Sequence, residues 1–168
     1  CPPGNAGCAG SPYGFSWSSW EPDFFTPGAA LLAAAPWVVV RGDHETCNRG
    51  GQGWWRLLDP RPLAPGQDCN HPANDAIGDH SEPYGVPIDD DMMFVVFDSA
   101  VVGGRALKPT ETQYQVYARQ FEKAFAIGAT CPHAFFMNHH PILGFGSDGT
   151  PKAQPGNAAL QSVLDSIV

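Results

Sequence analysis

Two short polar clusters contain the side chains of this sequence that could do chemistry. The first is Gly42-Asp-His-Glu45, which offers a carboxylate for a hard metal ion, an imidazole that can transfer a proton, and a second carboxylate to orient it. The second is Asn138-His-His-Pro141. Alone, the first cluster is typical of a solvated turn, and the second is typical of a structural histidine pair. Together they favour a metal site to which both contribute.

Each cluster follows an apolar run that predicts a buried β-strand. Trp37-Val-Val-Val-Arg41 precedes the first cluster, and Ala134-Phe-Phe-Met137 precedes the second. In open α/β sheets, ligands bind at the carboxyl ends of the strands. If the two strands are neighbours in one parallel sheet, Asp43 and His139 converge on one metal ion. Neighbouring residues of a strand point to opposite faces, so His140 is expected to turn away behind His139.

The remaining apolar patterns predict further short elements of an α/β fold. A helix is expected over Pro27–Ala35, and another buried strand over Met92–Phe97. An amphipathic helix should open at residues 110–111 and end at Gly128. Its apolar stripe is formed by Tyr114, Tyr117, Phe121 and Phe125. A last helix begins near Leu160, and its apolar stripe is expected to run to the end of the chain.

Long loops are expected between these elements because glycine and proline are abundant, with 19 and 17 among 168 residues. Residues 1–27 predict an aromatic, Gly/Pro-rich surface loop, and residues 42–91 predict a mostly irregular segment. Asp89-Asp-Asp91 is expected to be a solvated turn rather than a calcium site. Asp98 follows a strand and either supports a site there or forms a turn.

The charge balance excludes some classes of partner. Nine Lys and Arg residues against 17 Asp and Glu residues give a net charge of −8. An acidic surface repels phosphate backbones, which argues against nucleic acid and anionic membrane as partners. No run of eighteen or more apolar residues occurs, so no membrane span is expected.

The five cysteines indicate an oxidising compartment. Cys47 and Cys69 bracket a loop and are expected to form a disulfide, and Cys1 and Cys8 could close a smaller loop. No C-x-x-C pair occurs, which argues against structural zinc. A periplasmic or secreted location follows, although free thiols in a cytosolic protein remain the alternative. The opening Cys-Pro-Pro-Gly, without Met, predicts a processed chain or a fragment.

The two polar clusters resemble motifs of the calcineurin-like metallophosphoesterases, the superfamily that includes the purple acid phosphatases. Val38-Val-Val-Arg-Gly-Asp-His-Glu45 is similar to the family's G-N-H-[DE] motif. Phe136-Met-Asn-His139, with Pro141 two residues later, is similar to its V-x-x-H motif. The segment 47–61 looks like the insertion found in a bacterial, exported branch. The resemblance implies that residues 1–168 are the central and C-terminal part of one domain, a four-layer α/β/β/α sandwich that is incomplete in this chain.

The resemblance also implies roles for individual residues. Phosphate esters would be hydrolysed at two transition-metal ions, Fe, Zn or Mn, that clamp the ester during in-line attack of an activated water. Asp43 and His139 inherit the role of ligands to the same metal ion. His44 inherits the role of protonating the leaving oxygen. Glu45 and His140 would lie behind these residues and hold them in place.

The sequence departs from the family pattern in two ways, and both affect the activity that is expected of this chain. Asp43 stands where the family has Asn, which adds a negative charge beside the phosphate. The family's D-x-[HG], G-D-x-x-[DY] and G-H-x-H motifs are absent, so the chain supplies ligands for one metal only. The isolated chain is expected to be inactive, with the missing ligands coming from the rest of the same domain, in cis or as another chain. The alternative is a non-catalytic, secreted, disulfide-bonded binding module that kept the fold and lost the metals.

Overall fold

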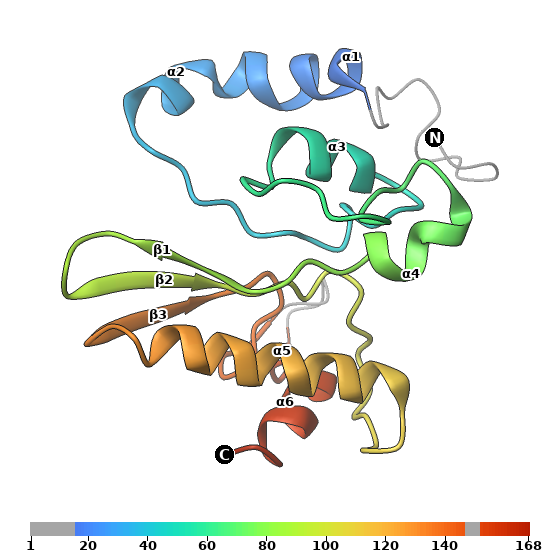
Figure 1. The fold of residues 1–168 in the computed structure, drawn as a ribbon, viewed down its shortest axis with the longest axis vertical. Coiled ribbons are helices and arrows are strands. Elements are labelled where there is room, and N and C mark those ends of the chain that lie inside the picture. The colour runs from blue at the N-terminus through green and yellow to red at the C-terminus, as the bar shows by residue number, and fades with distance from the viewer. Residues whose placement is uncertain (1–15, 147–151) are drawn as a thin grey trace. The chain divides into compact units, whose positions relative to one another are not determined.

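The chain contains helices and one small mixed sheet, and it divides into two compact units. The computed structural model describes residues 16–146 and 152–168. Unit 1 is Cys1–His80 and unit 2 is Ser81–Val168. Figure 1 shows the sheet and its helices in unit 2 and the short helices of unit 1. The protein is therefore α/β, as the sequence predicts. The expected small loop between Cys1 and Cys8 lies outside the described residues.

Unit 1 begins with a continuous helical segment where a loop is predicted. Helix α1 spans Trp17–Trp20, a π-helical turn spans Glu21–Phe25, and α2 spans Thr26–Ala34. The expected loop over 1–27 is thus wrong from Trp17 onward, whereas the helix predicted over Pro27–Ala35 is confirmed. The prolines at the starts of the second and third pieces lack the amide hydrogen of a regular α-helix. The hydrogen-bond pattern changes there, so no regular periodicity marks the segment.

The predicted strand over Trp37–Arg41 is wrong. These residues carry neither helix nor strand, and Trp37 is exposed while Val38–Val40 are half-buried. Valine favours an extended backbone, but a strand also requires a hydrogen-bonded neighbour. The described strands all belong to unit 2, so this run has no described strand of its own unit to pair with.

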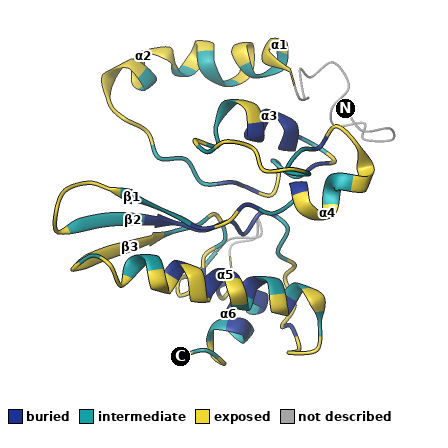
Figure 2. Cartoon of the chain, in the orientation of Figure 1, coloured by how far each residue is buried: buried dark blue, intermediate teal, exposed yellow. Residues whose placement is uncertain are grey.

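The segment expected to be irregular, 42–91, contains regular elements. Helix α3 spans Gly51–Leu57, a 3₁₀ turn spans Pro72–Asn74, and α4 spans Asp75–Gly78. Helix α3 is largely buried (Figure 2). Its Trp54 and Trp55 form the core of unit 1 with the two sulfurs of a disulfide. Burial of these rings offsets the weak helix propensity of the two glycines in the helix.

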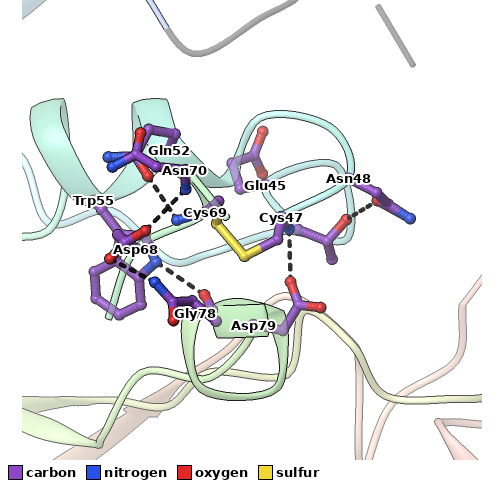
Figure 3. The surroundings of a disulfide bond; sticks show 12 residues. Glu45, Cys47, Asn48, Gln52, Trp55, Asp68, Cys69, Asn70, Gly78 and Asp79 are labelled. Atoms are coloured by element: carbon purple, nitrogen blue, oxygen red, sulfur yellow. Dashed lines mark hydrogen bonds between the residues drawn. A yellow bond between two sulfur atoms is a disulfide. The ribbon is translucent and has the colours of Figure 1, made fainter. Parts of the chain in front are cut away.

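The predicted disulfide between Cys47 and Cys69 is confirmed, with a sequence separation of 22 residues. Figure 3 shows how its two ends are anchored. The Cys47 backbone N–H donates to Asp79 Oδ1 at 2.6 Å, and the Cys69 N–H donates to Gln52 Oε1 at 2.6 Å. Cys131 is a free thiol.

Unit 2 is built on a three-stranded sheet in the order β1-β2-β3. Strand β1, Tyr84–Pro87, is antiparallel to β2, Met92–Val96, which is parallel to β3, His133–Met137. Strand β1 is the last element missed in 42–91, and Asp89–Asp91 form an exposed part of its hairpin turn with β2. Strands β2 and β3 are confirmed. The expectation that β3 is buried is wrong, because it is an edge strand with exposed residues.

One long helix connects the parallel strands and covers the sheet. Helix α5 spans Thr112–Gly128 and contacts all three strands, which confirms the predicted amphipathic helix. Three residues of the predicted stripe are buried and one, Phe125, is exposed. Helix α6, Ala158–Leu164, packs on α5, and the Asn157 side chain accepts the Leu160 N–H at its start. This helix ends before Val168, so the expectation that it runs to the chain end is wrong.

Candidate functional site

The first polar cluster forms a tight turn in unit 1. The Glu45 N–H donates to the Gly42 carbonyl at 3.1 Å, and the Gly42 N–H donates to Glu45 Oε2 at 3.1 Å. Asp43 and His44 occupy the two central positions of this turn, as is common for polar residues beside glycine. Their side chains are 53% and 56% exposed, with Asp43 Oδ2 and His44 Nε2 3.8 Å apart. The turn thus presents a carboxylate and an imidazole together to solvent.

The buried side chain of Arg41 holds this turn in place. It is fully buried, and its Nε donates to the Glu45 carbonyl at 2.8 Å while Nη2 donates to the Gly78 carbonyl at 2.8 Å. The guanidinium lies 5.1 Å from the centroid of the Trp55 ring, and the indole N–H of Trp55 donates to the same Gly78 carbonyl at 2.9 Å. Asp79 Oδ1 lies 4.0 Å from Nη2 and supplies the opposite charge. A buried charge with these partners ties the turn to the end of α4.

Sequence reasoning placed Arg41 at the end of a strand and missed this role. A signal was present, because an arginine directly after three valines requires buried acceptors if the run is packed. One acceptor, the Glu45 carbonyl, is local, whereas the Gly78 carbonyl and the Asp79 carboxylate lie far along the chain, and no local pattern identifies those two.

The second polar cluster lies at the carboxyl edge of the parallel strands in unit 2. The Phe97 N–H donates to the Met137 carbonyl at 2.9 Å, which extends the ladder to the strand ends. Just beyond it, Ser99 Oγ lies 3.2 Å from His140 Nδ1 and accepts the His140 backbone N–H at 3.2 Å. The rings of His139 and His140 meet edge to face, with centroids 4.9 Å apart. His140 is therefore held by Ser99 of the loop after β2, and His139 stands beside it.

Asp98 has a structural role at this edge. It is buried, and Oδ2 accepts both the backbone N–H of Ser81 at 2.7 Å and its hydroxyl at 2.9 Å. Its Oδ1 accepts the Ala100 N–H at 2.9 Å, which forms the turn after β2. Of the two alternatives raised from the sequence, turn formation is thus observed directly.

The donors of the two clusters suit transition metals in kind, since carboxylate and imidazole both bind Zn, Fe and Mn. Asp43, His44 and Glu45 belong to unit 1, whereas His139 and His140 belong to unit 2. Across residues 16–146 and 152–168, no three His, Cys, Asp or Glu side chains are grouped to hold a metal ion. The sharing of one metal ion by Asp43 and His139 stays a prediction from the sequence.

Neither a protein-family model, nor a curated protein, nor a solved structure matches this chain. Among the described residues, no helix is long and apolar enough to cross a membrane.

Proposed function

We propose that the protein is part of a calcineurin-like metallophosphoesterase that hydrolyses phosphate esters with two transition-metal ions. One structural observation supports this most. The histidine cluster follows β3 at the carboxyl edge of a parallel strand pair, where His140 contacts Ser99 from the loop after β2. That edge is where α/β enzymes bind ligands. A sheet covered on one face by α5 also supports the larger proposal that the chain contributes to an α/β/β/α sandwich.

The proposed roles follow the motifs residue by residue. Asp43 and His139 would be ligands of one metal ion, and a bound metal pair would neutralise the charge of the phosphate. His44 would protonate the leaving oxygen, a role for which its exposed place in the turn leaves it accessible. Glu45 accepts a backbone N–H across the turn and so keeps Asp43 and His44 in place.

The number of metal ligands that the chain supplies decides whether the isolated chain can be active. Since the family's D-x-[HG], G-D-x-x-[DY] and G-H-x-H motifs do not occur in the sequence, the remaining ligands would come from the rest of the domain, in cis or as a second chain. We expect the isolated chain to be inactive for this reason. The Cys47–Cys69 disulfide supports a periplasmic or secreted location.

Hydrolysis of p-nitrophenyl phosphate by the complete protein tests the proposal. His44→Ala should keep the metals and lower kcat by roughly 10²–10⁴-fold, as the loss of a general acid does. His71→Ala, another exposed histidine of unit 1 outside the motifs, is the matched control and should keep full activity. A folded, metal-free complete protein without turnover would instead favour a secreted binding module. Equal activity of His44→Ala and the wild type would exclude the acid role.

A further inference from the structure

Unit 1 contains an aromatic groove that the proposed reaction does not use. Its volume is about 280 Å³, close to the lower limit of about 300 Å³ for small-molecule sites. Four aromatic rings line it together with the aliphatic side chains of residues 38–40 and 58. The rings are those of Trp20, Phe24, Trp37 and Trp54. Among the described residues, Glu45 is the one ionisable side chain in the lining, and no Lys or Arg takes part.

The rings of the groove are held in place by contacts of their own. The indole N–H of Trp37 donates to the Leu31 carbonyl at 3.1 Å, which fixes a ring that is otherwise 48% exposed. Trp20 lies against α3 so closely that a Cβ on Gly53 would stand 1.8 Å from its Nε1. Glycine is therefore required at that position of α3. Trp54 is almost fully buried. The groove is thus a preformed surface, and its rings lose little freedom when a ligand binds.

The electrostatics of the groove select for positive charge. The faces of aromatic rings carry the negative part of the ring quadrupole and attract cations within about 6 Å of the ring centre. Glu45 adds a carboxylate at the same surface, and its Oε2 is held by the Gly42 N–H at 3.1 Å. An apolar lining disfavours small, strongly hydrated ions, since these would lose their water. The apolar lining favours a cation whose charge is surrounded by methyl groups, because such a cation is only weakly hydrated.

We propose that this groove binds a quaternary ammonium group, as in a choline-like head group. The groove shares Glu45 with the turn of Asp43 and His44, but choline binding there requires no metal ion and can be tested without it. Three features of the lining, as far as the described residues form it, carry the assignment: several rings at one surface, a single carboxylate, and no Lys or Arg side chain.

Titration of the purified chain with choline chloride, in the presence of a chelator, tests the proposal. Binding is followed by calorimetry and tryptophan fluorescence, with sodium chloride matched for ionic strength. The neutral isostere 3,3-dimethylbutan-1-ol has the same shape without the charge. We expect saturable binding of choline and much weaker binding of the isostere. Equal binding of the two would overturn the proposal, and so would no saturable binding of choline by the folded chain.

Two variants and a matched control assign the binding to the groove. Trp37→Leu should weaken choline binding by about 2–30-fold, the range of one cation–π contact. Glu45→Gln should also weaken it, because the attraction of the carboxylate for the cation is lost. Trp17→Leu is the control, because Trp17 is also exposed, at 51%, but stacks on Phe25 and does not line the groove. Circular dichroism verifies the fold of each variant. If Trp17→Leu weakens binding as much as Trp37→Leu, the groove is not the site.

Discussion

At the residue scale, Arg41 shows how one buried charge can hold a reactive turn. Its guanidinium bonds to two carbonyls from separate parts of unit 1 and stacks on Trp55. Lysine could not reproduce this arrangement, since it offers a point charge in place of a planar fork. The position of Asp43 and His44 therefore depends on Arg41, which lies outside the cluster Gly42-Asp-His-Glu45.

Arg41→Lys is expected to lower the free energy of unfolding by about 2 kcal/mol, because a buried carbonyl loses a charged donor. Urea unfolding followed by tryptophan fluorescence measures this change. Arg56→Lys, an exposed position on α3, is the control and should leave the unfolding midpoint unchanged. If Arg41→Lys leaves the midpoint unchanged as well, Arg41 does not anchor the turn.

The sequence identified the residue types of both clusters but not their supporting contacts. Asp43, His44 and the histidine pair were predicted from local motifs, because a motif is contiguous. Ser99 contacts His140, which is 41 residues away, and Asp98 contacts Ser81, which is 17 residues away. A single sequence contains no signal for such pairings. The contacts made by these residues could therefore be found only in the folded chain.

At the element scale, an ion pair holds the start of α5. Arg105 donates to Glu111, the N-cap residue, and the Lys108 N–H donates to the same carboxylate at 2.9 Å. The bond from Arg105, followed by that from the Lys108 backbone, lowers the pKa of Glu111 from 4.5 to about 2. Because the pKa is lower in the folded state, the pair stabilises the fold fully above pH 4.5. This contribution is lost as the pH falls from 4.5 to about 2.

Arg105→Ala should return the pKa of Glu111 toward its ordinary value, which an NMR titration of the Glu111 carboxyl carbon measures. In urea unfolding, Glu111→Gln should lose less stability than the wild type as the pH falls from 4.5 to about 2. Identical pH dependence of the two proteins would show that the pair does not contribute to the stability of unit 2.

The elements that were predicted correctly are those whose signal is local. Helix α5 carries its own amphipathic stripe, and β2 is a continuous apolar run. Trp37–Arg41 has the same composition as a buried strand, but pairing is a property of two segments and not of one. Strand β1 was missed because its Gly and Pro are poor strand formers, and they are tolerated here since β1 is an edge strand paired with β2 on one side.

At the scale of the whole molecule, the five tryptophans and the disulfide all belong to unit 1. Tryptophan fluorescence therefore reports on unit 1, whereas hydrogen exchange of α5 reports on unit 2. The sandwich expected from the motifs requires more strands than the three described here, and it stays a proposal.

Replacing Cys47 and Cys69 with serine should lower the free energy of unfolding of unit 1 by about 3 kcal/mol, as expected for a loop of this length. Tryptophan fluorescence in urea measures this loss, and the exchange rates of α5 should stay the same. Cys131→Ser is the control, because its thiol is free. Alkylation of Cys47 and Cys69 without reductant would contradict the disulfide itself.

The proposed metal site takes, for one metal ion, a ligand from each of the two motifs. Metal content of the complete protein, measured by mass spectrometry of the bound elements, tests it most directly. We expect Asp43→Ala, His139→Ala and the double variant each to lose the same single metal ion. Retention of both metals by the single variants, or the loss of a second ion only in the double variant, would contradict it.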